Sequence, residues 1–253
     1  MDKLIELIRQ TKPIALDRGS AHDVEVKGLA DFVTSVDKRI QEFLRQRLAV
    51  MYPDVQFMSE EKDNSDIDYS GRVWVLDPID GTTNLIHDFK MSAVSLALVD
   101  NGVTVLGVVY NPFTDELFSA KRGEGAYLNG SPICVTASSA LSQSLVLVGT
   151  SPYRKELADV NFDIIKRLYI ASEDIRRCGA AALDLCYLAC GRADGFFERD
   201  LKPWDYAAGV AILREAGGMV TDFEGNEPSC RIPSDILASN GKIHREMKTI
   251  IKE

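Results

Sequence analysis

The stretch that decides the fold reads Val73-Trp74-Val75-Leu76-Asp77-Pro78-Ile79-Asp80-Gly81-Thr82-Thr83-Asn84. Its β-branched and aromatic first four residues are typical of a buried strand, which should end at Asp77. Asp77 and Asp80 stand three residues apart with a proline between them, so both carboxylates can point into one small volume. Divalent cations such as Mg²⁺ prefer oxygen ligands of this kind. The turn that follows, residues 81–83, can begin a helix whose free backbone N–H groups face an anion.

A plainer explanation is that Asp77 and Asp80 only cap a turn, because Asp-Pro and Asp-Gly pairs are common in loops. Two other acidic positions weaken it. Glu60 precedes the buried strand after an apolar run, and Asp205 stands at the start of a predicted helix. Taken singly, Asp205 is best explained as a helix cap and Glu60 as part of a solvated acidic loop. Their recurrence in similar settings favours a metal site.

Outward from this stretch, the pattern predicts a layered α+β or α/β sandwich of the αβαβα type. Apolar spacing predicts two N-terminal amphipathic helices, over residues 4–16 and 36–48. Four strand-like segments separated by good turn sequences predict an antiparallel meander: 92–99, 103–110, 116–120 and 126–135. These elements form an N-terminal lobe, residues 1–136, that carries the main metal site.

Residues 137–253 alternate between strands and helices, which predicts a C-terminal α/β lobe. Its strands are expected at 145–148, 195–198 and 236–238, and its helices at 160–169, 180–190, 205–216 and from 242 onward. This lobe contributes Asp205 and the substrate pocket. The chain shows no repeat, low-complexity tract or long linker, so the two lobes should share one interface.

Composition narrows the class of ligand. The 253 residues carry a net charge of −9, so nucleic acid is not expected as the main ligand. An acidic protein that handles phosphate needs positive charge from elsewhere, and divalent cations supply it. Neither the five cysteines nor His22, His87 and His244 show a zinc spacing. With no secretory signal and no apolar run near the roughly 18 residues of a membrane span, a cytoplasmic protein without membrane contact is expected.

The sequence also resembles the inositol monophosphatase family of metal-dependent, lithium-sensitive phosphatases. The motifs that carry the resemblance occur in family order between about residues 27 and 218. They are the segments 31–37, 60–61, 77–84, 177–182 and 204–209. The string from Asp77 to Asn84 is the most specific of them. The resemblance implies the fold, two or three Mg²⁺ ions as cofactors, and a homodimer.

Carried over by position, the resemblance implies that five residues bind the metals, Ile79 through its backbone carbonyl: Glu60, Asp77, Ile79, Asp80 and Asp205. It implies that Thr82, hydrogen-bonded to Asp37, helps Glu60 to activate a water for direct in-line attack, without a phosphoenzyme. Ser59 departs from the glycine that the family often has before its paired glutamates, which affects the geometry of the loop rather than the identity of the ligands.

For the substrate, the resemblance implies that Gly81 and Thr82 hold the phosphate, beside Asp80 and Asp205. Four residues would line the pocket for the alcohol: Gly179, Ala180, Ala181 and Glu198. Glu198 is expected to accept a substrate hydroxyl. Lys27 matches a family lysine near the metals and Arg176 adds positive charge, although a solvated surface role explains both comparably well.

The predicted function is Mg²⁺-dependent hydrolysis of phosphate monoesters, with inositol monophosphates and related polyol phosphates as substrates. One alternative is a fructose-1,6-bisphosphatase or other sugar-phosphate phosphatase of the same fold. A nucleotide 3′-phosphatase is disfavoured, because that branch usually has lysine where Thr83 stands. A regulatory or interaction protein that retains the fold without catalysis is an alternative of a different class. The intact set of carboxylates argues against it.

Overall fold

The helix predicted over residues 36–48 is confirmed in the computed structural model, which describes residues 1–252, as α4 (Ser35–Met51). Thr34 begins it: the Thr34 side chain accepts the N–H of Val36, and Asp37 accepts the N–H of Thr34. This capping box satisfies donors that no earlier turn can satisfy. Apolar side chains at helical spacing form one buried face of the helix: Val36, Ile40, Leu44 and Leu48.

The helix predicted over residues 4–16 is interrupted. It consists of α1 (Asp2–Arg9) and α2 (Lys12–Ala15), and α3 (Arg18–Ala21) follows. Pro13 stands in the first turn of α2, where its missing N–H does no harm. Within a continuous helix the same proline would break a backbone hydrogen bond, so the chain starts a new helix instead.

The antiparallel meander is confirmed as most of a seven-stranded sheet. In spatial order, its strands are β3 (Gln56–Ser59), β4 (Arg72–Asp80), β5 (Ala93–Asp100), β6 (Val103–Asn111), β7 (Glu116–Lys121), β8 (Ala126–Leu128) and β9 (Ser131–Ile133). Only β3 and β4 pair in parallel. The single strand predicted over 126–135 is two strands, because the chain turns at Asn129 and Gly130, both of which have positive φ.

Strand β4 continues beyond the end that the sequence predicted. Asp77 pairs with Ser95 and Asp80 pairs with Ala93, and the register shifts between these two pairs. Pro78 lies inside this irregularity, where a residue without an N–H costs the ladder nothing. A bulge changes the directions of the side chains around it. Asp77 and Asp80 therefore do not follow the regular alternation of side chains between the two faces of the sheet.

The C-terminal half forms a mixed five-stranded sheet. Its strands lie in the order β11 (Asp174–Arg176), β10 (Leu145–Val148), β12 (Gly195–Leu201), β14 (Ser234–Ser239) and β13 (Met219–Thr221). Strand β10 is parallel to both of its neighbours, and β14 is antiparallel to β12 and β13. The helices of this half are α6 (Ala158–Ala171), α7 (Ala181–Ala189), α8 (Pro203–Glu215) and α9 (His244–Lys252). The predicted alternation of strands and helices is therefore confirmed.

Several short elements were not predicted. The hairpin of β1 (Val24–Gly28) and β2 (Asp31–Thr34) is the largest of them. β3, β11 and β13, of three or four residues each, were also missed. The 3₁₀ turns η1 (Leu141–Gln143) and η2 (Lys155–Leu157) were not predicted either. The short helix α5 (Thr82–Ile86), by contrast, was predicted from the turn at residues 81–83.

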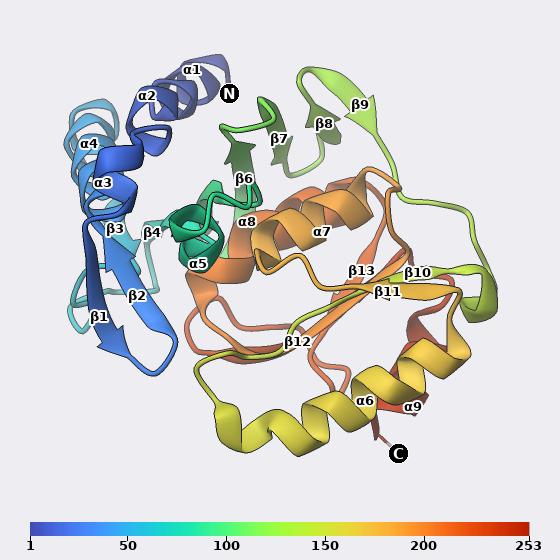
Figure 1. Cartoon of the computed structure of the whole chain (residues 1–253). Coiled ribbons are helices and arrows are strands. Elements are labelled where there is room, and N and C mark those ends of the chain that lie inside the picture. Colours follow the sequence, from blue (N-terminus) through green and yellow to red (C-terminus); the bar gives the residue numbers. More distant parts are fainter. Residues whose placement is uncertain (253) are drawn as a thin grey trace.

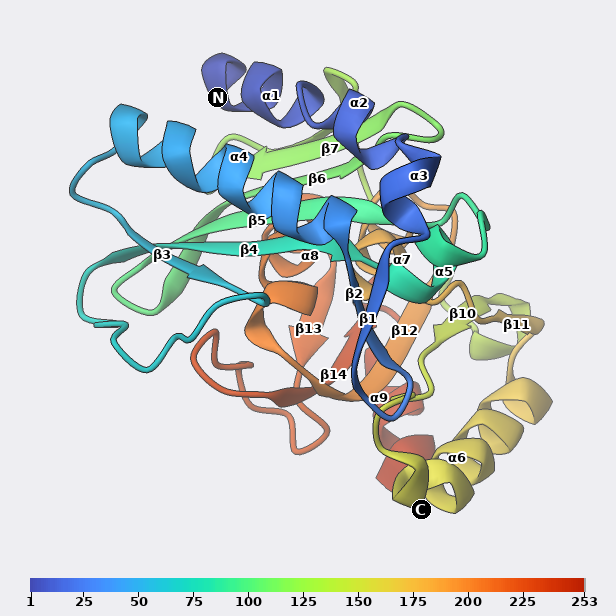
Figure 2. The same cartoon turned by 60° about the vertical axis from the view of Figure 1, so that its left-hand side comes forward.

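The layers follow the predicted αβαβα order (Figures 1 and 2). Helices α1 and α4 cover the outer face of the seven-stranded sheet, α7 and α8 lie between the sheets, and α6 and α9 cover the far face of the five-stranded sheet. The apolar core around α7 and α8 takes side chains from both halves of the chain. The division into lobes at residues 136 and 137 stays a prediction. Within residues 1–252, no helix has the length and apolar character needed to cross a membrane.

Helix α8 approaches the seven-stranded sheet very closely at one point. A Cβ atom added to Gly107 on β6 would lie 2.4 Å from the carbonyl oxygen of Ala208. That oxygen belongs to the backbone and cannot swing aside, so only glycine fits without a shift of the helix.

We therefore expect Gly107→Ala to lower the free energy of unfolding by about 1–3 kcal/mol through overpacking. Urea unfolding followed by circular dichroism measures the change. Gly71→Ala is the matched control, because a Cβ there would meet Gln56 at an ordinary 3.6 Å. Equal unfolding free energies for the two variants would contradict this account of the contact.

Candidate active site

The first two predicted ligands lie at the bulged end of β4 and are both buried. Asp77 is 2% exposed, and its Oδ1 accepts the N–H of Ile79 at 3.0 Å. Asp80 is 8% exposed, and its Oδ2 accepts the N–H of Ala182 at 2.7 Å, in the first turn of α7. A helix N-terminus favours a negative charge. Backbone donors therefore fix the direction of both carboxylates.

The other two carboxylates reach the same place from different elements. Glu60 follows β3 directly, and its N–H donates to the carbonyl of Leu76 at 3.3 Å, which extends the parallel pairing with β4. Asp205 lies in the first turn of α8, where its Oδ2 accepts the N–H of Lys202 at 2.7 Å. Asp205 is therefore not the N-cap that the sequence suggested: Lys202 holds that position, and Asp205, two residues after the helix begins, caps its N–H from within the first turn. The carboxylate lines the cavity described next.

A single cavity of about 360 Å³ brings all five predicted metal-binding residues together. Its walls include Glu60, Asp77, Ile79, Asp80 and Asp205. Gly81, Thr82 and Lys27 line it as well. Segments separated by more than a hundred residues therefore meet at one point, as the sequence predicted.

Burial and mutual repulsion act on all four carboxylates. Burial raises the pKa of Asp80 to about 7, with repulsion from Glu198 and Glu60 added to it. Burial also raises the pKa of Glu60 to about 7, although the positive charge of Lys27 opposes the shift. The pKa values of Asp77 and Asp205 lie well above the usual range, first because of burial and then because of the neighbouring carboxylates. Such crowding favours the arrival of a compensating cation.

The donor set fits magnesium, because the converging acidic groups are all carboxylates and the Ile79 backbone lies among them. In residues 1–252, no three histidine, cysteine, aspartate or glutamate side chains stand close enough together to enclose an ion as they are. The Lys27 ammonium group instead holds Glu60 at 3.0 Å and Glu61 at 2.7 Å. The lysine expected near the metals is therefore at the site.

The hydrogen bond predicted between Thr82 and Asp37 is confirmed. Oγ1 of Thr82 lies 3.2 Å from Oδ1 of Asp37 and 3.0 Å from the carbonyl oxygen of Ile79. A hydroxyl has one hydrogen to donate, so these two acceptors compete for it. Asp37 is fully buried, which raises its pKa to about 6 despite hydrogen bonds from Thr34. The catalytic roles of Thr82 and Asp37 stay predictions.

The turn after Asp80 is closely packed. Gly81 has a φ of 84°, and a Cβ there would lie 2.8 Å from the carbonyl oxygen of Met91. Glycine is therefore required at this point. The turn begins α5, so no earlier helical turn accepts the N–H groups of Gly81 and Thr82.

A second cavity of about 280 Å³ continues from the first, since the two share Asp80, Gly81, Thr82 and Asp205. Gly179, Ala181 and Glu198 line it as predicted. Glu198 is 8% exposed, and its Oε1 accepts the N–H of Ser151 at 3.0 Å. We call this space the substrate cavity and the first one the carboxylate cavity.

Two predicted substrate residues lie elsewhere. Ala180 is 1% exposed and packs behind the turn, where a Cβ on Gly81 would meet the Ala180 Cβ at 3.2 Å. Arg176 is ion-paired with Asp174 on its own strand and lines neither cavity. Its neighbour Arg177 lines the substrate cavity instead.

Sequence analysis missed a rim of residues around the two cavities: Tyr153, Arg154, Lys155, Arg177, Asp200 and Lys202. Three of them come from the segment after β10, which is held beside Glu198 because the N–H of Gly149 donates to the carbonyl of Phe197 at 2.8 Å. Loops that follow parallel strands gather at one edge of a sheet. The positions of these rim residues, just after the predicted strands at 145–148 and 195–198, could therefore have indicated that they lie near the site.

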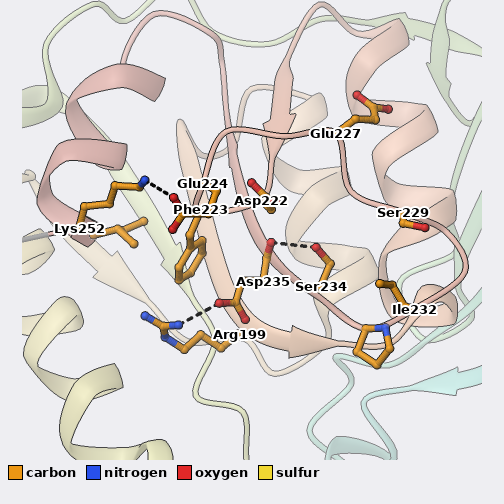
Figure 3. A pocket seen from close by; sticks show the side chains of 12 residues that line it. Arg199, Asp222, Phe223, Glu224, Glu227, Ser229, Ile232, Ser234, Asp235 and Lys252 are labelled. Carbon is orange, nitrogen blue, oxygen red and sulfur yellow. Dashed lines mark hydrogen bonds and ion pairs between the residues drawn. The ribbon is translucent and has the colours of Figure 1, made fainter.

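A larger cavity, about 690 Å³, lies between β12, β14 and α9 (Figure 3). Its lining shares no residue with the carboxylate cavity or the substrate cavity. Both of its cations are paired with carboxylates of the same lining: Arg199 with Asp235 at 2.8 Å and Lys252 with Glu224 at 2.5 Å. The carboxylates that converge without enough cations to balance them line the two smaller cavities, and we assign the active site to those cavities.

Comparison with known proteins bears on this arrangement directly. The model of the inositol monophosphatase family matches residues 2–253. The chain belongs to the inositol monophosphatase family. The predicted resemblance is thus confirmed, and with it the assignment as a phosphomonoesterase of this family.

Relatives and solved structures in this family are similar along almost the whole chain. The inositol-1-monophosphatase of Synechocystis is 39% identical over 230 residues, which cover 90% of this chain and 80% of that protein. The Nus factor SuhB of Escherichia coli is 39% identical over 227 residues, 90% of this chain and 85% of that protein. The crystal structure of the extragenic suppressor protein suhB from Bartonella henselae has a TM-score of 0.92 at 35% identity, covering 100% and 98% of the two chains.

We expect Asp80→Asn to lower kcat for phosphate release from myo-inositol 1-phosphate by roughly 10³-fold, because it removes a charge from a water-poor cavity. The fold should persist, since the asparagine oxygen can still accept the N–H of Ala182, and circular dichroism checks this. Asp194→Asn is the matched control: Asp194 is 7% exposed but lies outside both cavities. Similar kcat values for the two variants would contradict the assignment of the site.

Proposed function

We propose that this phosphatase requires Mg²⁺ and hydrolyses inositol monophosphates and related polyol phosphates. The observation that carries the proposal is the convergence of four carboxylates, two buried and two half-buried, on one cavity that continues into a glycine turn and a second cavity. The family relatives named inositol-1-monophosphatase support the choice of substrate.

Glu60, Asp77, Asp80, Asp205 and the Ile79 carbonyl would hold the ions. Magnesium bound there supplies positive charge to the phosphoryl oxygens and lowers the pKa of an attacking water. The protein's own groups then have positioning roles. The backbone N–H groups of Gly81 and Thr82 would bind the phosphate, as helix N-termini do. The Thr82 hydroxyl, held by Asp37 at 3.2 Å, would orient the water together with Glu60.

The substrate cavity would hold the alcohol part of the ester. Glu198 lines it with a carboxylate that can accept a hydroxyl hydrogen. Gly179 and Ala181 line the same cavity with no side chain or a methyl group only, which would leave room for a polyol ring beside Glu198. No protein residue would form a covalent bond to phosphorus. Water attacks phosphorus, the bond from phosphorus to the alcohol oxygen breaks, and the departing oxygen gains a proton.

A sugar-phosphate phosphatase is the alternative within the same fold. The alternative of another class is a protein that acts by interacting with a partner. The name of one relative, Nus factor SuhB, is the specific reason to consider it. The complete set of carboxylates argues for catalysis, because a protein that works only through a partner needs no cluster of four converging acids. The two roles are compatible in one chain.

Removal of metal should abolish phosphate release, and MgCl₂ should restore it, because the carboxylates lack the positive charge that the phosphoryl group needs. Phosphate release after EDTA treatment measures this. In the same assay, kcat/KM for myo-inositol 1-phosphate should exceed that for adenosine 3′,5′-bisphosphate. Comparing it with kcat/KM for fructose 1,6-bisphosphate decides between the inositol and sugar branches. Undiminished turnover in EDTA would overturn the proposal.

Three finer features belong to the same proposal: inhibition by lithium, a homodimer, and a cytoplasmic location. They rest on the family resemblance. Lithium titration of the Mg²⁺-supported activity, light scattering and cell fractionation test them in turn.

A further inference from the structure

Five residues line both the carboxylate cavity and the substrate cavity: Asp80, Gly81, Thr82, Asp205 and Tyr153. The proposed function gives the first four a part in binding the ions or the phosphate, and it gives Tyr153 none. The phosphate would lie at the turn of Gly81 and the alcohol in the substrate cavity, so the ester bond between them lies where the two cavities join. Tyr153 therefore stands beside the bond that is hydrolysed.

A tight turn after β10 carries Tyr153. The N–H of Arg154 donates to the carbonyl of Ser151 at 2.9 Å, which closes a β-turn over residues 151–154. Pro152 occupies the second position of this turn, where the fixed φ of proline is favourable. Tyr153 occupies the third position, at the tip. The backbone that carries the tyrosine is therefore restrained on both sides.

Both ends of this turn are attached to strand β12. At one end, the N–H of Ser151 donates to Oε1 of Glu198 at 3.0 Å. At the other end, Nη1 of Arg154 lies 2.9 Å from Oδ2 of Asp200. The two β12 residues line the substrate cavity and the carboxylate cavity in turn, so the attachments follow the line along which the cavities join. The fold itself thus positions Tyr153 at the junction, before a substrate binds.

The Tyr153 hydroxyl is available to a ligand, because it makes no hydrogen bond within residues 1–252. Although 52% of the residue is exposed, partial burial and the charges of Asp205 and Glu60 raise the pKa of its phenol. The hydroxyl therefore keeps its proton and can donate it in a hydrogen bond. The side chains of Asp80 and Asp205, once ionised, can only accept, so Tyr153 adds a donor that these neighbours lack.

We propose that Tyr153 is a further catalytic residue, whose hydroxyl donates a hydrogen bond to the ester oxygen that leaves with the alcohol. This inference rests on the proposed function and adds a residue to its site. When water attacks phosphorus and the bond from phosphorus to the ester oxygen breaks, negative charge develops on that oxygen. The oxygen takes up a proton that the attacking water releases, and Tyr153 keeps its own. A donor directed at charge that develops during the reaction stabilises the transition state more than the bound substrate.

The test is Tyr153→Phe, assayed at saturating Mg²⁺ on two substrates whose leaving groups differ: myo-inositol 1-phosphate and p-nitrophenyl phosphate. The inositol oxygen holds its developing charge alone, whereas p-nitrophenolate spreads the charge over its ring. We therefore expect kcat for myo-inositol 1-phosphate to fall roughly tenfold, as for the loss of one hydrogen bond to a charged oxygen. For p-nitrophenyl phosphate kcat should change by about twofold or less, and KM should stay close to the wild-type value for both substrates.

The matched control is Tyr169→Phe, which removes the same hydroxyl from a tyrosine of similar exposure, 57%, on α6 and outside both cavities. It should leave the kinetics of both substrates unchanged.

Three results for Tyr153→Phe would refute the inference: equal losses of kcat on both substrates, a change in KM alone, or no change. Each would show that the hydroxyl does not act on the leaving oxygen. If the wild-type protein does not turn over p-nitrophenyl phosphate, the division of the effect between kcat and KM on myo-inositol 1-phosphate decides alone. Absence of phosphate release from myo-inositol 1-phosphate by the wild-type protein would instead refute the proposed function, and the inference with it.

Discussion

Repulsion among four converging carboxylates, two of them buried and two half-buried, is the interaction on which the rest of this site depends. Buried charges are normally paired or bind metals, yet only Lys27 forms an ion pair with the cluster among the described residues. Hydrogen bonds from the backbone at Ile79, Ala182 and Lys202 hold three of the carboxylates in place despite the repulsion. The protein thus accepts a local electrostatic cost of folding, which a bound cation offsets.

Much of the fold was predictable because its signals are local. The strands of the meander and the helices of the C-terminal half follow from hydrophobic period and turn sequences, and Asp77 to Asn84 fixes the centre of the site. The hairpin β1–β2 was missed because nearly all of β1 is exposed, so it shows no alternation of buried and exposed side chains. The extension of β4 through Pro78 was missed because a proline normally ends a strand, and only tertiary pairing with Ala93 carries it on.

The convergence of the site was predictable only in part. Spacing places Asp77 and Asp80 together; the similar settings of Glu60 and Asp205 suggested that they belong to the same site, and the family resemblance assigned them as ligands. The choice between Arg176 and Arg177 depends on the side to which each side chain points where the three-residue edge strand β11 ends, since Arg176 is its last residue and Arg177 follows it. No periodic pattern is long enough there to decide it. The packing of Arg177 over Gly179, 98 residues along the chain from Gly81, exists only in the folded protein.

Helix α8 both carries Asp205 and is buried along most of its length against the two sheets. The segment after β10, by contrast, is exposed at residues 153–156 and contacts the site only at its rim. Selection can therefore alter what the rim recognises at small expense in folding free energy, whereas a change at α8 disturbs stability and ion binding together. This separation places ion binding on a buried helix and recognition on an accessible segment of the same chain.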